Sequence, residues 1–366
     1  MKPLTQILLL LLLCLSVGCR KEFSERADAF GDGGAAVQIN AAIADRANAT
    51  KAIITDPEFP DKSTYGIFVC KHGGYEKHKL NSWNLGAVYN LNKEDQTGTW
   101  SYYYVSDQKK GGLSDYGYDF ITITASQDNA TADLYAYAPH TTEAFLNGPT
   151  AIPFTIMERS IDQADLMYAL ENAEPDQNKG LDPKGDDPLV ANFTFQHALS
   201  QLVFTFKLIN DNTLYKLNNI VVKKAKDNTT AKLLKSGTFN AIDGSFAGED
   251  VDSLSVRFST ETNPAPIIIN SKDNRAVARM LIPPTAVEDD DLVVEFYMND
   301  KPQVVRSFVL KKEYLKHWDG SQYGFQGGYT YTFHFTMDNY LYLNGIDIDD
   351  TWMEADPENQ LKEIEI

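Results

Sequence analysis

The sequence has few cysteines and no long hydrophobic run. Three of its 366 residues are cysteine, at positions 14, 19 and 70. The apolar stretch 7–17 is shorter than the ~20 residues that a helix needs to cross a bilayer. If export and anchoring use the first two cysteines, Cys70 has no partner for a disulfide. It is then interpreted as a small buried hydrophobe, and the core alone must hold the mature chain together.

Positive charge is also scarce. The chain has 33 Lys and Arg against 51 Asp and Glu, which gives a formal net charge of −18. Proteins bind nucleic acid by neutralising its phosphates with basic side chains, so this composition excludes nucleic acid as a partner. It equally opposes electrostatic docking onto anionic lipid. The charge balance therefore indicates an acidic domain that reaches a membrane, if at all, through an attached lipid.

The short motifs of common catalytic sites are missing as well. The chain contains no G-x-S-x-G, H-E-x-x-H or C-x-x-C motif and no phosphate-binding glycine loop. His72 and His78 flank a glycine pair, but no second pair of metal ligands accompanies them. We therefore expect a protein that is not an enzyme and that has no cofactor and no metal site.

The N-terminus is typical of an exported lipoprotein. Lys2 provides a basic start, the stretch 7–17 is almost purely apolar, and Gly18 is a small residue before Cys19. These three features describe a secretory signal. The segment 15–19 resembles the bacterial lipobox, with Ser16 where that motif usually has leucine. The resemblance predicts that Cys19 is acylated, palmitate included, and anchors the chain in the outer membrane, since several acyl chains hold a protein firmly.

The rest of the chain is patterned for β structure. Apolar and polar residues alternate with period two in many short segments, separated by clusters rich in Gly, Asn and Asp. These segments are 37–43, 65–69, 100–105, 120–124, 134–137, 193–195, 202–206, 292–297, 329–335 and 340–348. We expect an all-β protein built from antiparallel sandwiches.

The chain is longer than one typical domain, which predicts two. The polar stretch 171–187 has too little apolar area to pack and is interpreted as the connection between them. We expect a signal peptide over 1–18, a flexible tether over 19–36, and β-sandwich domains over 37–185 and 186–366.

Five segments, in order along the chain, resemble motifs of the Bacteroidetes fimbrillin family. They are 133–139, 165–169, 193–204 with its F-x-H-A-L-S-x-L pattern, 280–284 and 328–333. The resemblance implies two transthyretin-like β-sandwich domains in tandem. It also implies a type V pilus subunit whose partners are other fimbrial subunits, in a homo- or heteropolymer. His197, flanked by Phe195 and Leu199, is interpreted as a structural residue.

In that family an N-terminal strand is removed by an Arg- or Lys-specific protease, and a neighbour's strand fills the groove. Val37–Ile43 alternates like such a strand, and the polar segment behind it offers cleavage between Arg46 and Ala47. The stretch 340–348 is either the donor strand or the last strand of its own domain.

A second hypothesis stays open at this point. The chain could be a surface lipoprotein that does not polymerise and instead binds glycans or host ligands. Trp83, Trp100 and Trp318 would suit a sugar platform, because aromatic faces stack on the apolar faces of sugar rings. The same residues are more simply interpreted as core or strand-face residues.

Overall fold

A computed structural model describes residues 34–43, 62–78, 83–92, 97–103, 121–124, 131–169, 178–182, 189–210, 213–225, 230–258, 266–288, 292–299, 303–315 and 323–349. Strands dominate these ranges, and the helical segments among them are short 3-10 turns. The prediction of an all-β fold is confirmed. No helix in the described ranges is long and apolar enough to cross a membrane.

The described residues pack as two compact units whose chain segments interleave. The first unit takes the residues up to Thr150 and Ala169–Phe195, and the second takes Ala151–Tyr168 and the residues from Gln196 onward. The segment before Tyr168 belongs to the second unit because β7 (Ile152–Thr155) pairs there with β12 (Leu233–Phe239). A single domain boundary between residues 185 and 186 stays a prediction.

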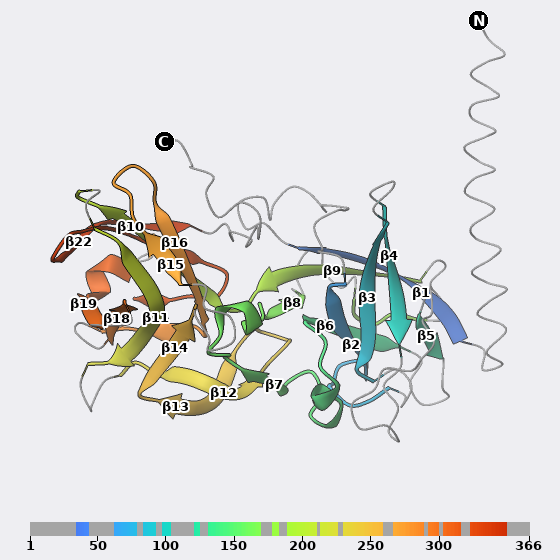
Figure 1. The fold of residues 1–366 in the computed structure, drawn as a ribbon. Helices are drawn as coiled ribbons and strands as arrows, with labels where there is room; N and C mark the ends of the chain where they lie inside the picture. Colours follow the sequence, from blue (N-terminus) through green and yellow to red (C-terminus); the bar gives the residue numbers. More distant parts are fainter. Residues whose placement is uncertain are drawn as a thin grey trace, which may run out of the picture. The chain divides into compact units, whose positions relative to one another are not determined.

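The first unit is built on one eight-stranded sheet (Figure 1). Its hydrogen-bonded order is β4-β3-β2-β6-β8-β9-β1-β5. The strands are β1 (Gly34–Ile43), β2 (Thr64–Lys71), β3 (Leu85–Asn92), β4 (Thr97–Tyr103), β5 (Ile121–Thr124), β6 (Ala132–Ala138), β8 (Met167–Ala169) and β9 (Leu189–His197). Strands β2 and β6 lie in the middle of this order and are buried on both faces over nearly their whole length.

This sheet is strongly curled. Tyr65 of β2 has its ring 5.3 Å from the ring of Phe195 in β9, measured between centroids. Two strands separate β2 from β9 in the sheet order. Neighbouring strands lie ~4.8 Å apart, so a flat sheet would hold these two strands about three times that distance apart. The curl therefore encloses an apolar core on the concave side.

The segment 133–139 contains a buried tyrosine whose ring and hydroxyl group are fixed by neighbouring residues. Tyr137 is 1 % exposed, and its hydroxyl donates to Oδ1 of Asn84 at 2.7 Å. Asn84 is itself fully buried and has a positive φ of 52°. Gly66 lies against the Tyr137 ring so closely that a Cβ at this position would overlap ring atoms. Burial removes the Tyr137 phenol from water, so the hydroxyl stays protonated and serves as a donor.

The second unit is a sandwich of two main sheets. One has the order β16-β10-β21-β22, and the other has the order β14-β11-β18-β19, with β15 beside β11. Their strands are β10 (Ser200–Leu208), β11 (Tyr215–Lys224), β14 (Ser253–Arg257), β15 (Ile267–Ile269), β16 (Ala276–Ile282), β18 (Leu292–Met298), β19 (Val304–Leu310), β21 (Thr330–Met337) and β22 (Leu341–Asp349). Three small strands, β13 (Phe246–Val251), β17 (Thr285–Ala286) and β20 (Gly324–Phe325), complete the unit, with β13 beside β12 and β17 beside β20.

Aromatic side chains fill the space between these two sheets. Phe296 of β18 meets Phe204 and Phe206 of β10 at centroid distances of 5.2 and 5.1 Å, both edge to face. Phe335 of β21 is 5.4 Å from the same ring. Offset and edge-to-face aromatic pairs add about 0.5–1.5 kcal/mol each beyond their area burial. The second unit is thus a β-sandwich, while the tandem transthyretin-like arrangement stays a prediction.

We expect Gly66→Ala to destabilise the first unit by about 1–3 kcal/mol, because the added methyl group must displace the buried, hydrogen-bonded Tyr137 ring. Gly74→Ala is the matched control, since a Cβ at Gly74 meets nothing closer than a carbonyl oxygen at 4.0 Å. Urea unfolding followed by tryptophan fluorescence measures both. Equal midpoints for the two variants would contradict the packing described for Tyr137.

Candidate strand-exchange site

Strand β1 lies between β9 and β5 in the sheet of the first unit (Figure 1). It runs parallel to β9, with Val37 opposite Leu189 and Ile43 opposite Phe195. On its other side it runs antiparallel to β5, with Val37 opposite Ile121. The expectation that Val37–Ile43 forms a strand is confirmed. Residues 34–37 of this strand pair with β5 and residues 37–43 pair with β9, so Val37 is the residue with a paired strand on both sides.

The side chains of β1 contribute to the apolar core. Directly paired residues of neighbouring strands point to the same face of a sheet. Alternate residues of β9, namely Leu189, Ala191, Phe193 and Phe195, are at most 2 % exposed. Their partners on β1 are Val37, Ile39, Ala41 and Ile43, of which Val37 is 1 % exposed. Val37 is thus a core residue, whereas Ile39, Ala41 and Ile43 are half-buried beside the buried face of β9.

The opposite edge of β9 is held by an asparagine. Asn178 donates from Nδ2 to the carbonyl oxygen of Asn192, and its Oδ1 accepts from the N–H of Asn192 at 2.7 Å. The N–H and C=O of one residue point to the same side of a strand, so the residues adjacent to Asn192 present their backbone groups to β1. Sequence reasoning placed Asn178 in a solvated connection and missed this role, since no periodic pattern marks it.

The geometry defines what the loss of β1 would leave behind. The backbone groups of β9 that face β1 and those of β5 would lack partners, and apolar side chains of β9 would face water. Unpaired backbone groups and exposed apolar surface together form a template for another strand. This region is therefore a candidate strand-exchange site.

Strand β22 resolves one alternative for the C-terminal stretch. Leu341–Asp349 pairs antiparallel with β21 as the edge strand of its sheet, so in this structure it is the last strand of its own unit. Its outer edge has no neighbouring strand among the described residues. The predicted lipidation site Cys19 and the predicted cleavage site at Arg46 and Ala47 lie outside the described residues.

The segments that resemble fimbrillin motifs meet one another in the second unit. The N–H of Gly328 donates to the carbonyl oxygen of Leu199 at 2.8 Å, and that of Gln201 donates to Tyr329 at 2.9 Å. The hydroxyl of Ser200 donates to the carbonyl oxygen of Gln326 at 2.8 Å. These bonds join the start of β10 to the turn before β21, where the two strands begin their parallel pairing. The motifs thus carry structural hydrogen bonds.

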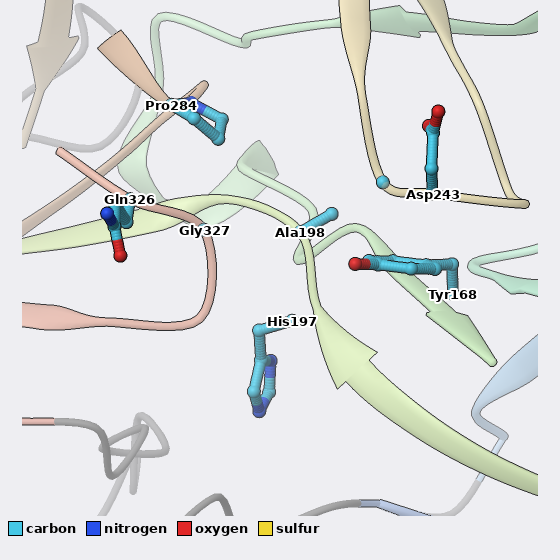
Figure 2. Close-up of a pocket in the computed structure, with 8 residues that line it drawn as sticks. Tyr168, His197, Ala198, Asp243, Pro284, Gln326 and Gly327 are labelled. Atoms are coloured by element: carbon cyan, nitrogen blue, oxygen red, sulfur yellow. The ribbon is translucent and has the colours of Figure 1, made fainter. Parts of the chain in front are cut away.

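His197 belongs to the same junction. Its Nδ1 lies 2.6 Å from Oδ2 of Asp165, and the N–H of Ala198 donates to the carbonyl oxygen of Leu166 at 2.7 Å. The imidazole is thereby fixed against the segment 165–169, which agrees with its interpretation as a structural residue. Figure 2 shows the imidazole directed away from Pro284.

A shallow hollow of about 200 Å³ lies at this junction. Tyr168, Ala198, Asp243, Pro284 and Gln326 contribute to its lining (Figure 2). Tyr168 packs under Gly244, where a Cβ would overlap the phenol ring. Tyr168, Ala198 and Pro284 come from three of the segments that resemble fimbrillin motifs, so the hollow lies where these segments meet.

Two of the tryptophans singled out in the sequence pack against neighbouring residues. Trp83 is 5 % exposed and donates from Nε1 to the carbonyl oxygen of Phe145 at 2.8 Å. Trp100 packs against Tyr65 and Tyr89 at centroid distances of 4.5 and 4.9 Å. Trp83 is therefore a core residue, Trp100 is half-buried, and Trp318 lies outside the described residues.

The buried carboxylate of Asp133 organises the loops near Cys70. It accepts from the backbone N–H groups of Gly73 and Gly180 at 2.9 and 2.8 Å and lies 2.8 Å from Nδ1 of His72.

Cys70 is fully buried, as the sequence predicted. Burial, with a smaller contribution from the Asp133 charge, raises the pKa of the Cys70 thiol to about 12. Among the described residues, no group of three or more His, Cys, Asp and Glu is arranged to hold a metal ion.

Comparisons with known proteins define the family. The sequence profile of the fimbrillin-like family matches residues 50–351, so the chain belongs to this family. Its members are fimbrial and adhesion-related proteins of the cell surface. A comparison with curated protein sequences gives no significant match.

Comparison with solved structures gives matches at low sequence identity. A candidate cell adhesion protein from Bacteroides uniformis has a TM-score of 0.50 and 14 % identity, over 87 % of this chain and 98 % of that one. A candidate cell adhesion protein from Bacteroides ovatus has a TM-score of 0.48 and 16 % identity over 87 % and 98 %. The tip fimbrial protein Mfa3 from Porphyromonas gingivalis has a TM-score of 0.40 and 8 % identity over 87 % and 100 %.

We expect Val37→Asp to loosen the first unit, because it places a carboxylate at a position that is 1 % exposed between two strands. In a chain without residues 1–18 and with Cys19→Ser, Cys70 is the single thiol and reports on this unit. A thiol with a pKa of about 12 scarcely reacts at pH 8 in the folded state. Reaction with Ellman's reagent should accelerate at least tenfold in Val37→Asp and stay at the parent rate in Val37→Ile. Equal rates in all three proteins would contradict the core position of β1.

Proposed function

We propose that this protein is a fimbrial subunit that assembles by donor-strand exchange. It is exported as a lipoprotein, and a protease cuts the chain after Arg46 at the outer surface. Strand β1 then leaves with the anchor, and an extended strand of another subunit takes its place between β9 and β5. The single observation that supports this proposal is the pairing of β1 with the buried strand β9 along residues 37–43, with Val37 in the core.

A covalent link normally protects β1 from replacement. While β1 is tethered to the rest of the chain, its effective concentration at the groove is in the millimolar range, far above that of any competing strand. The number of backbone hydrogen bonds changes little on exchange. A donor strand of similar pattern therefore binds the groove about as strongly per residue as β1 does. Cleavage removes the advantage of the tether, and the subunit concentration then decides which strand fills the groove.

The donor is a strand of similar alternation from another subunit. The groove requires small or branched apolar side chains at every second position, since Leu189, Ala191, Phe193 and Phe195 line it. Tyr340 and the strand β22 that follows provide alternation of this kind at the other end of the chain. Use of β22 as the donor requires the loss of its pairing with β21. A strand whose backbone groups are unpaired before exchange would therefore be the donor with the lower free-energy cost.

The lipid anchor places the subunit at the site of assembly. Acylation of Cys19 would hold the precursor on the outer membrane, with the residues between Cys19 and β1 linking the anchor to the first unit. The arginines at positions 20 and 26 lie before β1, whereas Arg46 lies after it. Only cleavage after β1 releases the strand together with the anchor. The proposal therefore predicts that a cut after Arg46 allows assembly and that cuts at positions 20 and 26 do not.

Limited digestion with an Arg-specific protease tests the exchange. We expect the wild-type chain, cut after Arg46, to form ladders of multimers that survive detergent on a gel without heating and collapse on boiling. Arg46→Gln should stay monomeric under the same digestion.

Arg26→Gln serves as the matched control, since it removes a cut that cannot free β1, and it should polymerise like the wild type. Multimers from Arg46→Gln would contradict the proposed cleavage position. A wild-type chain that is cut after Arg46 and stays monomeric would overturn strand exchange and favour a surface lipoprotein that does not polymerise.

The anchor has its own test in a bacterial host with lipoprotein processing. We expect metabolic labelling with a palmitate analogue to mark the wild-type protein and Cys14→Ser, but not Cys19→Ser. The Cys19→Ser protein should also move from the membrane fraction to the soluble fraction. Label retained by Cys19→Ser would show that lipidation at this residue is wrong.

A further inference from the structure

A second hollow lies on the outer face of the four-stranded sheet in the second unit. Its volume is about 240 Å³, and strands β10, β21 and β22, together with the turn before β16, contribute its lining. The polar and charged side chains of the lining are Thr205, Lys207, Arg275, His334, Thr336 and Asn344. No carboxylate belongs to the lining, although the chain as a whole carries a net charge of −18. We call this hollow the basic pocket.

The two cations of the basic pocket have no acidic partner among the described residues. Lys207 forms no ion pair there, and Arg275 contacts the Nδ1 of His334 at 3.5 Å instead of a carboxylate. On the same face of the sheet, Arg279 of β16 lies opposite Val203 of β10. Its Nε has no hydrogen-bond partner in the described chain. Positive charge left unpaired in a strongly acidic protein marks a place where an anion gains binding energy.

The His334 imidazole is held in a fixed orientation inside this group. Its Nε2 lies 2.8 Å from Oδ2 of Asp347, and its Nδ1 lies 2.8 Å from the hydroxyl oxygen of Thr205. Asp347 is the acidic group that faces the pocket wall from β22. Its carboxylate already interacts with the imidazole of His334. The carboxylate of Asp347 is therefore directed to the imidazole and leaves Lys207 and Arg275 available to a ligand.

A β-bulge forms the floor of the pocket. The register between β21 and β22 shifts between His334 and Phe335, which leaves Asn344 as the extra residue beside Gly345. A Cβ added at Gly345 would meet no atom within 4 Å, so the backbone is open to the hollow at this point. Bulges commonly re-aim side chains and are found next to binding sites.

The remaining groups at the pocket suit a sugar. The hydroxyl of Thr336 and the amide of Asn344, which lie 3.3 Å apart, can both donate and accept hydrogen bonds. Tyr342, directly opposite Thr336 on β22, is 44 % exposed and provides an aromatic face at the rim. A pocket of this volume is smaller than the ~300–1,000 Å³ of sites for drug-sized ligands, which fits a single ring.

We infer that the basic pocket binds a sugar that carries a carboxylate, such as a uronic acid residue of a surface glycan. Lys207 and Arg275 bind the carboxylate, Thr336 and Asn344 bind ring hydroxyls, and Tyr342 packs against the apolar ring face. The pocket lies on the face of a sheet whose strands are already paired, so an extended peptide strand would gain no backbone pairing there. The inference concerns the second unit and is independent of strand exchange in the first.

Titration of the mature chain, with Cys19→Ser for solubility, tests this site. The probe is sodium glucuronate, followed by ligand-detected NMR at low salt. Glucose, which lacks the carboxylate, and acetate, which lacks the ring, are the matched ligands. We expect saturable binding of glucuronate and at least tenfold weaker binding of glucose and acetate. Added salt should weaken the glucuronate affinity, because charge attraction contributes to it.

Two variants locate the binding at the pocket. Lys207→Gln should weaken glucuronate binding by about tenfold, since a charge-assisted hydrogen bond is lost. Gly345→Leu should abolish binding by filling the hollow without a change in charge. Lys216→Gln, at an exposed lysine of β11, is the control for net charge and should bind like the parent. Thermal unfolding confirms that all three variants are folded.

Three outcomes would overturn the inference. One is absence of glucuronate binding to the folded parent chain, and another is equal binding of glucuronate and glucose. The third is retention of full affinity by both Lys207→Gln and Gly345→Leu. A peptide with the acidic sequence of residues 355–366 provides the last comparison. If it binds the pocket more tightly than glucuronate, the ligand is an acidic peptide and the assignment to a sugar is wrong.

Discussion

The pairing of β1 with β9 is the constraint on which the first unit depends. A strand must occupy this position, because the apolar side chains of β9 and the backbone groups beside them would otherwise face water. The register Val37 to Leu189 through Ile43 to Phe195 satisfies both requirements at once. Nothing in this requirement demands that the strand come from the same chain. Strand exchange is feasible because the groove needs a strand but does not specify which chain provides it.

The second unit is held differently. Its two sheets enclose aromatic rings from β10, β18 and β21, and the parallel pairing of β10 with β21 begins at a junction of main-chain hydrogen bonds. Residues of the family signature form this junction: Leu199 and Ser200 bond to Gly328 and Gln326. The fimbrillin-like motifs therefore include residues that join strands of this sandwich, and the imidazole of His197 is held by Asp165 beside them.

The charge distribution separates two roles. A net charge of −18 keeps the chain soluble and repels nucleic acid and anionic lipid, so contact with a membrane depends on the proposed lipid at Cys19. Against this background the unpaired Lys207 and Arg275 form a local exception on one sheet face. Assembly would rest on the apolar groove of the first unit, and recognition on the basic pocket of the second. The two proposed functions would use different physical forces, so variants can test them separately.

Local pattern was enough to locate many of the strands. Val37–Ile43, Tyr65–Val69 and Leu202–Phe206 alternate with period two, a short-range property that is visible in any single sequence. The same reading identified Cys70 as buried and the motifs 193–204 and 328–333 as related to fimbrillins. The pattern could not show that these two motifs touch, since the Thr330 hydroxyl reaches Gln201 across 129 positions.

Tertiary structure alone decided which strands are neighbours and what they enclose. The clamp of Asn178 on Asn192 lies in a stretch without periodicity, and the basic pocket joins residues 207, 275, 334 and 344 from separate strands and a turn. The burial of Trp83 was likewise open in the sequence and was settled by packing. The physical reason is that alternation specifies only which face of a strand is buried. Partner and register depend on long-range contacts, which form only when the whole chain is folded.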